Sequence, residues 1–206
     1  DRRDQLRLVR ALDVVGIEPV EIADEETVPA EREVRVREVQ EARLLGLLRR
    51  GILLDVAGTQ GVEALDPKQV ISPAEMEAAA RAAKVQVRSG DVVLVRTGWI
   101  RLWPEQRKYY SVQSGQPGLN LEAARWATDQ GAFCLGSDNF AVEVVPSPGN
   151  TMPVHVHCLV EKGVHLLEVV NLEELARTRT FEFLLVMVPL KIRGGTASPV
   201  RPLAII

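Results

Sequence analysis

From Gly51 to the C-terminus, the sequence predicts a mixed α/β domain. Three observations indicate this class. Apolar runs of strand length recur along the chain, amphipathic helix patterns lie between them, and turns rich in Gly and Pro separate the two. Such alternation is typical of domains in which helices cover a central sheet.

The expected elements follow from local signals. Ser72 is suited to cap a helix, Pro73 to occupy its first turn and Glu75 to reach back to the cap, whereas Gly131 and Gly163 are suited to end helices. In chain order we expect strands at 52–56, 90–96, 132–135, 164–170, 180–190 and 202–206, helices at 72–84, 121–130 and 153–162, a helical turn at 172–176, and a loop at 99–118.

Residues 1–50 differ in character from residues 51–206, and we expect two parts divided there. An amphipathic helix is indicated at 6–15 and a short strand at 17–22. The stretch 31–50 is dense in Arg and Glu and carries one apolar stripe, which predicts a charged helix. The first 50 residues contain neither His nor Cys, and we find no catalytic pattern in them.

The composition excludes several classes of protein. The 206 residues carry a formal net charge of −3, without the basic stripe of a nucleic-acid-binding protein. No run approaches the roughly 20 apolar residues that span a bilayer, and the charged N-terminus is unlike a signal peptide. Cys134 and Cys158 lie in apolar surroundings, which predicts free thiols and a cytoplasmic protein.

All three histidines fall in one short segment, at His155, His157 and His165, and Glu168 follows in an apolar run. A carboxylate buried alone is costly, so Glu168 requires a cation, a hydrogen-bond network or a metal. A helix from His155 advances about 12 Å, and a strand returning from Gly163 covers about 13 Å. This reversal brings Glu168 back to His155.

An imidazole and a carboxylate suit Zn²⁺ or Mn²⁺, but catalytic zinc usually has three protein ligands and a water. Two alternatives stay open. His155 is a structural hydrogen-bonding residue, or Glu168 pairs with a buried Arg96 or Arg193. We interpret His157 and His165 as packing or surface residues, because a helix turns His157 to nearly the opposite face from His155.

A series of short segments follows from about Leu45 to the C-terminus. They are Arg50-Gly-Ile-Leu-Leu-Asp-Val-Ala57, Gly61-Val-Glu-Ala-Leu65, Gly90-Asp-Val-Val-Leu-Val-Arg-Thr-Gly-Trp99, Pro117-Gly-Leu119, Gly136-Ser-Asp-Asn139, Ala141-Val-Glu-Val-Val-Pro146, Pro153-Val-His155 and the run from Leu190 to Ala204. In the order and spacing of these segments, the chain resembles the cyclase family of metal-dependent hydrolases, which includes kynurenine formamidase (arylformamidase) and isatin hydrolase.

The resemblance implies a swivelling β/β/α fold with a mixed central sheet, assembled as homodimers or homotetramers. It implies one or two divalent metals, Zn or Mn, held here by His155 and Glu168. Asp138 matches a family position and is expected to orient a ligand or substrate; turn chemistry is the alternative. Glu143 is expected either to support a metal ligand or to form a buried structural pair.

The chain departs from the family in one respect. Members carry a His-x-Gly-Thr-His-x-Asp signature upstream of the Leu-Leu-Asp-Val strand, and this chain has no histidine before His155. Three explanations remain open: the chain lacks its true N-terminal part, it is a degenerate member, or another subunit supplies ligands. The general base is therefore unassigned.

Three functions follow as hypotheses. The first is hydrolysis of a C–N bond in a small aryl formamide, amide or lactam, such as an N-formylkynurenine-like compound of tryptophan catabolism. The second is a non-catalytic family member that oligomerises or binds a ligand. The third is a structural zinc shared between subunits at His155 and His157. Aromatic residues of the loop 99–118 either line a substrate pocket or pack only against each other.

Overall fold

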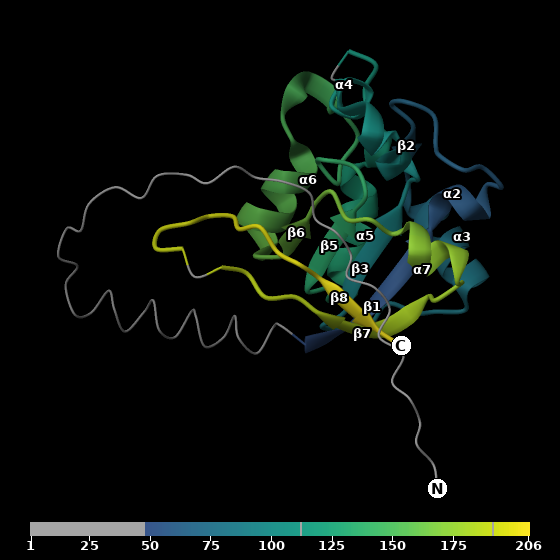
Figure 1. Ribbon diagram of the computed structural model, residues 1–206. Coiled ribbons are helices and arrows are strands. Elements are labelled where there is room, and N and C mark those ends of the chain that lie inside the picture. The colour runs from purple at the N-terminus through teal and green to yellow at the C-terminus, as the bar shows by residue number, and fades with distance from the viewer. Residues whose placement is uncertain (1–47, 112, 191) are drawn as a thin grey trace, which may run out of the picture.

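The computed structural model describes residues 48–111, 113–190 and 192–206, and its centre is a six-stranded mixed sheet (Figure 1). The strands lie in the order β6-β5-β3-β1-β7-β8. Four parallel strands are β1 (Leu48–Asp55), β3 (Val92–Arg96), β5 (Cys134–Ser137) and β6 (His165–Leu167); β7 (Glu182–Val186) and β8 (Leu203–Ile205) form an antiparallel half with β1. The predicted mixed α/β class is confirmed.

Helices connect the strands and cover the sheet. They are α2 (Val56–Thr59), α3 (Pro73–Ala83), η1 (Trp99–Glu105), α4 (Gln106–Tyr109), α5 (Leu121–Asp129), η2 (Pro148–Asn150), α6 (Pro153–His155), the π-helix η3 (Val156–Lys162) and α7 (Glu173–Arg177). A separate two-stranded parallel sheet joins β2 (Val70–Ile71) and β4 (Gly118–Leu119).

Each face of the main sheet has its own apolar core, because successive strand side chains point to opposite faces. On one face, Ile52 and Leu54 pack in a core with Met76 of α3. On the other, Leu53 packs in a core with Leu175 of α7. This double covering explains why the parallel strands are continuous apolar runs rather than alternating ones.

The helix predicted at 72–84 is confirmed as α3, and its start is built as the sequence indicates. The Glu75 carboxylate accepts the Ser72 backbone N–H at 2.7 Å, which satisfies a donor at the helix start. The helix predicted at 121–130 is α5, where Asn120 caps by accepting the Ala123 N–H at 2.8 Å.

Two local predictions are wrong. The segment 99–118 contains the short helices η1 and α4 in place of a plain loop. The charged helix expected to reach residue 50 is replaced at its end by β1, because Leu48 pairs with Val186 and Arg50 with Leu184 in the antiparallel ladder. These pairs lie far apart in the sequence, so a local helical pattern gives no sign of them.

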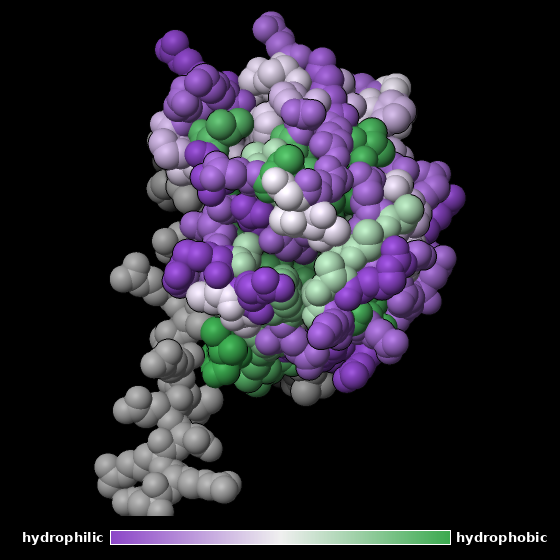
Figure 2. All heavy atoms as spheres, turned by 90° about the vertical axis from the view of Figure 1, so that its right-hand side faces the viewer, coloured by the Kyte–Doolittle hydropathy of each residue, from purple (hydrophilic) through white to green (hydrophobic). Residues whose placement is uncertain are grey.

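The elements expected at 6–15, 17–22 and 31–47 lie outside the described residues. The division into residues 1–50 and 51–206 stays a prediction, and β1 runs across position 50. Within the described part, no helix is long and apolar enough to cross a membrane. The face that carries α2, α3 and α7 is mostly hydrophilic, with small separate groups of apolar side chains (Figure 2).

Candidate functional site

The carboxyl ends of the four parallel strands meet at one edge of the sheet and place four ionisable side chains there. Asp55 ends β1, Arg96 ends β3, Asp138 follows β5 and Glu168 follows β6. In α/β sheets this edge is where ligands commonly bind, because the strands stop there and the side chains that follow are free to converge.

The structure brings His155 and Glu168 together. The helix that begins at Pro153 continues through η3 and ends at Gly163, whose positive φ of 64° suits a glycine. The chain then returns along β6, and His155 Nε2 lies 3.3 Å from Glu168 Oε1. The chain reversal expected from the sequence therefore exists, and the assignment of the pair as metal ligands stays a prediction.

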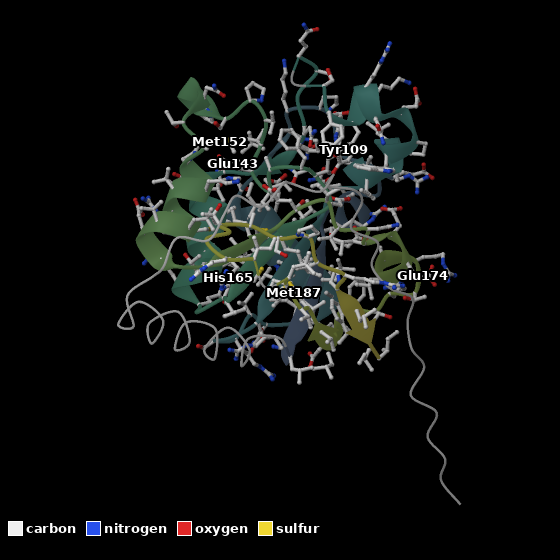
Figure 3. The ribbon with its side chains drawn as sticks, turned by 60° about the vertical axis from the view of Figure 1, so that its left-hand side comes forward. Tyr109, Glu143, Met152, His165, Glu174 and Met187 are labelled. Atoms are coloured by element: carbon white, nitrogen blue, oxygen red, sulfur yellow. The ribbon has the colours of Figure 1, made fainter. Side chains whose placement is uncertain are left out.

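Glu143 is buried and holds His155 from the other side. Its carboxylate accepts His155 Nδ1–H at 2.7 Å, His155 N–H at 3.1 Å and Val154 N–H at 3.4 Å. The two backbone donors belong to the start of α6, where helical N–H groups have no partner within the helix. Glu143 lies close to Met152, just before this helix (Figure 3). The imidazole is thereby fixed with Nε2 directed toward Glu168.

The two carboxylates set the charge of the imidazole. The hydrogen bond with Glu143 and, after it, the one with Glu168 raise the pKa of His155 to about 9, against an opposing effect of burial. The raised pKa favours the protonated imidazole of His155, which lies between Glu143 and Glu168. The buried pair expected for Glu143 is present, and its role in supporting a metal ligand stays a prediction.

The backbone is strained on both sides of this cluster. Val142 precedes Glu143 with φ 59°, and Val169 follows Glu168 with φ 57°. β-branched residues rarely adopt the left-handed region, and each such residue costs about 1–3 kcal/mol. Strain of this kind clusters at functional sites, so it supports a role for Glu143 and Glu168. Nothing in the sequence predicts a valine in this conformation.

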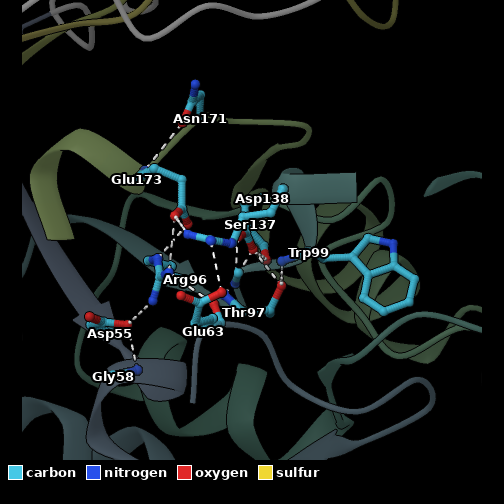
Figure 4. Close-up of polar contacts among 12 residues, drawn as sticks. Asp55, Gly58, Glu63, Arg96, Thr97, Trp99, Ser137, Asp138, Asn171 and Glu173 are labelled. Carbon is cyan, nitrogen blue, oxygen red and sulfur yellow. Dashed lines mark hydrogen bonds and ion pairs between the residues drawn. The ribbon is translucent and has the colours of Figure 1, made fainter. Parts of the chain in front are cut away.

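Asp138 is fully buried at the end of β5, and its carboxylate accepts hydrogen bonds from the turn after β3. It accepts the Thr97 hydroxyl at 2.6 Å, the Thr97 N–H at 2.8 Å and the Gly98 N–H at 2.7 Å (Figure 4). Burial raises the pKa of Asp138 to about 6 although these hydrogen bonds favour the carboxylate. Asp138 thus stabilises the turn at Thr97 and Gly98, whereas the expected turn chemistry lay within its own segment Gly136-Ser-Asp-Asn139. A role in orienting a ligand or substrate stays a prediction.

Arg96 forms a second ionic cluster, which sequence reasoning missed. Its guanidinium donates to Asp55 at 2.9 Å and to Glu173 at 2.6 and 3.1 Å (Figure 4). A shallow pocket of about 360 Å³ lies over these residues. The pairing of Arg96 with Glu168, one of the alternatives considered from the sequence, is wrong because Asp55 and Glu173 take the guanidinium. The only sequence signal is an Arg at the end of an apolar strand.

The other histidines take structural positions. His157 is 2% exposed, with Nε2 2.9 Å from Thr128 Oγ1 and Nδ1 2.9 Å from Glu161. His165 packs its ring 5.0 Å from that of Phe133. Packing roles for both are confirmed. A zinc shared between subunits at His155 and His157 is disfavoured, because both ring nitrogens of His157 are already engaged inside the protein.

The site offers two donor side chains, which is fewer than the number of protein ligands that a catalytic metal usually has. Among the residues that the structure describes, no group of three or more His, Cys, Asp or Glu side chains is arranged to hold a metal ion. His155 and Glu168 have the right donor atoms, and Glu143 is occupied with the second ring nitrogen of His155.

The chain belongs to the cyclase family, because the family model described as putative cyclase matches residues 24–144 of its 206. The resemblance noted from the sequence is confirmed. The match begins within the first 50 residues, the part that we set aside as different. No curated protein matches the chain.

Solved structures of cyclases and hydrolases share the fold. A novel cyclase is 31% identical, with a TM-score of 0.70 over 77% of this chain and 53% of that one. An isatin hydrolase bound to the product analogue thioisatinate is 21% identical, with a TM-score of 0.66 over 79% of this chain and 61% of that one. A potential metal-dependent hydrolase with cyclase activity is 20% identical, with a TM-score of 0.56 and coverages of 79% and 67%. This chain thus spans between half and two thirds of their lengths.

Proposed function

We propose that this chain takes part in the metal-dependent hydrolysis of a C–N bond in a small aryl formamide, amide or lactam. The observation that carries the proposal is the placing of His155, held through Nδ1 by buried Glu143 and presenting Nε2 to Glu168. Metal-binding histidines typically donate their second ring nitrogen to a carboxylate in this way. Two solved structures with this fold, an isatin hydrolase and a potential metal-dependent hydrolase, support the reaction class.

The geometry of the pair suits a divalent ion in type and spacing. Two ligands of a tetrahedral zinc at about 2.0–2.1 Å stand roughly 3.3–3.4 Å apart, and His155 Nε2 and Glu168 Oε1 are 3.3 Å apart. Catalytic zinc usually takes a third protein ligand, which the described residues do not provide.

Each residue of the site has a defined task in this proposal. His155 and Glu168 hold the ion, Zn or Mn, and Glu143 orients the imidazole. A divalent ion bound there supplies a Lewis acid and makes water a better nucleophile at neutral pH. We leave the general base unassigned. We further propose N-formylkynurenine-like compounds as substrates, a cytoplasmic location and a homodimeric or homotetrameric assembly.

The test is the metal content of the full 206-residue chain, purified without chelator and measured by mass spectrometry. We expect about one ion per chain in the wild type and loss of the ion in both His155→Ala and Glu168→Gln. Glu161→Gln is the matched control, since Glu161 lies on the same helical segment with a side chain that is 54% exposed. Full metal occupancy in both site variants would refute the assignment.

A second candidate is a family member without catalysis that oligomerises or binds a ligand. The pair of donors, rather than three, in the described residues favours it. A folded wild-type chain that retains no metal and hydrolyses neither formanilide nor isatin would establish this candidate over the first.

A further inference from the structure

We infer that the short strand β4 (Gly118–Leu119) and Asn139 are positioning residues, which fix the backbone of Glu143 and through its carboxylate orient the imidazole of His155. Pro117-Gly-Leu119 is one of the segments that carry the family resemblance, and the proposed reaction gives it no task. The effect on metal binding rests on the function proposed above, whereas the orientation of the imidazole does not.

Leu119 holds the backbone on both sides of Glu143. Its N–H donates to the Val142 carbonyl at 3.0 Å, and its carbonyl accepts the Val144 N–H at 3.1 Å, so that Leu119 and Glu143 form a parallel bridge. Leu119 is fully buried, which shields both hydrogen bonds from water. The chain therefore cannot turn about Glu143 without breaking one of them.

The backbone groups of Glu143 itself are also bonded. Its N–H donates to the Ala141 carbonyl at 2.5 Å, which closes a γ-turn around Val142 and its positive φ of 59°. Its carbonyl accepts Asn139 Nδ2–H at 3.1 Å, and the same amide nitrogen donates to the Pro117 carbonyl at 2.7 Å. Asn139 thus joins the residue before β4 directly to Glu143.

The amide of Asn139 is used through its donors. Asn139 is fully buried, and within the described ranges its Oδ1 has no hydrogen-bond partner. A buried acceptor without a partner is costly, so such groups are rare in folded proteins and call for an explanation. The explanation here is that the two N–H bonds of Asn139 are kept at the expense of its oxygen.

Gly118 is required for space rather than for its backbone conformation. Its φ lies outside the left-handed region, so other residues could adopt it. A Cβ atom at this position, however, would overlap the backbone carbonyl of Glu143 and the backbone nitrogen of Val144. Backbone atoms cannot move aside as a flexible side chain does. Any side chain at Gly118 therefore displaces Glu143.

A displaced Glu143 would loosen His155. The Glu143 side chain is 1% exposed and accepts His155 Nδ1–H at 2.7 Å. Hydrogen bonds weaken steeply when their geometry is disturbed, and an imidazole that loses its carboxylate partner binds metal less tightly. If β4 and Asn139 serve only stability, changing them weakens the fold and leaves the contact between Glu143 and His155 as it is.

The experiment compares Gly118→Ala with Gly51→Ala in the full chain. Gly51 is a matched control, because it is also buried, its φ is also outside the left-handed region, and a Cβ there would overlap the ring of Phe183 instead of Glu143. Both variants are expected to lose stability, since each adds a methyl group to a packed position. Only Gly118→Ala is expected to change His155.

Two measurements follow the change at His155. The first is the chemical shift of its Nδ1 by NMR, at one pH and without metal, which the presence of only three histidines makes assignable. In Gly118→Ala we expect this shift to move toward the value found in Glu143→Gln. The second is zinc affinity by competition with a chelating dye, which we expect to fall about 10-fold in Gly118→Ala and by no more than about 2-fold in Gly51→Ala.

Asn139→Ala makes the same test without adding bulk. It removes both N–H donors and leaves the carbonyls of Pro117 and Glu143 without them. We expect the His155 Nδ1 shift to move in the same direction as in Gly118→Ala. This variant decides the question if circular dichroism shows that Gly118→Ala does not fold.

The outcomes separate this inference from the proposed hydrolysis. An unchanged Nδ1 shift in folded Gly118→Ala and Asn139→Ala overturns the positioning role, and so does an equal change in Gly51→Ala. A shift that moves in the first two variants alone upholds that role, even if the wild-type chain binds no zinc and the proposed function fails. Zinc binding by the wild type with an unchanged shift in both variants upholds the metal site and overturns the positioning role.

Discussion

Two ionic clusters lie at the carboxyl edge of the sheet, one around Arg96 and one around His155. They differ in how completely their charged side chains are paired. Arg96, at one end, has a side chain only 7% exposed and two carboxylate partners at 2.9 and 2.6 Å. His155, at the other end, is bonded tightly to Glu143 at 2.7 Å but only loosely to Glu168 at 3.3 Å.

Exposure separates the two clusters further. The Glu168 side chain is 38% exposed, whereas that of Glu143 is 1% exposed. One acid therefore fixes the imidazole from inside, and the other is open to solvent and to a ligand. The Arg96 cluster, in which the cation is fully paired, is suited to stabilise the fold. The His155 cluster, in which the contact with Glu168 is longer and accessible, is suited to bind a ligand. Incomplete pairing at an accessible acid, rather than the presence of charge, favours the His155 cluster as the binding site.

Breaking the Arg96 cluster is expected to give the largest effect on stability. Arg96→Met leaves Asp55 and Glu173 without their cation in a partly buried position, and we expect a loss of about 2–4 kcal/mol in the free energy of unfolding. Urea denaturation measures this. Metal content should not change, because Arg96 has no contact with His155 among its hydrogen bonds.

Arg177→Met is the control for the Arg96 variant. Arg177 pairs with Glu174 on the same short helix, and its side chain is 70% exposed. We expect no measurable change in stability, since exposed ion pairs contribute little. An Arg96 variant as stable as this control would show that the Arg96 cluster does not stabilise the fold.

Glu143→Gln tests the His155 cluster. The amide still accepts one hydrogen bond, but it cannot hold a protonated or metal-bound imidazole as a carboxylate does. We expect zinc affinity to fall by about 10- to 100-fold, measured by competition with a chelating dye. An unchanged affinity, with Glu161→Gln as reference, would mean that Glu143 has only a packing role.

The smallest expected effect concerns Asp138, which lies between the two clusters. Burial raises the pKa of Asp138 to about 6, above the value of about 3.9 in an unfolded chain. The folded state therefore binds the extra proton, and this contribution to stability is present below about pH 4 and is lost as the pH rises through about 6.

Asp138→Asn should remove this pH dependence of the free energy of unfolding. Between pH 4.5 and 7, we expect the stability of the wild type relative to the variant to fall by on the order of 1 kcal/mol. Parallel pH profiles of the unfolding free energy would contradict the raised pKa of Asp138.

Local signals predicted the parts of the fold that depend on neighbours in the sequence. The capping residues Ser72 and Glu75 mark the start of α3, and Gly163 ends the helical segment that carries His155. The same reasoning failed at Leu48–Arg50, where pairing with β7 replaces a helical pattern. Sequence spacing also predicted that Glu168 returns to His155, because helix rise and strand rise nearly cancel over that length.

By itself, the sequence determined the mixed α/β class, the family resemblance and the pair His155 and Glu168. The fold was needed to show which acid holds His155 and that Arg96 pairs with Asp55 and Glu173. The physical reason is that ion pairs depend on distance in space and on exclusion of water, and both are set by strand order and burial.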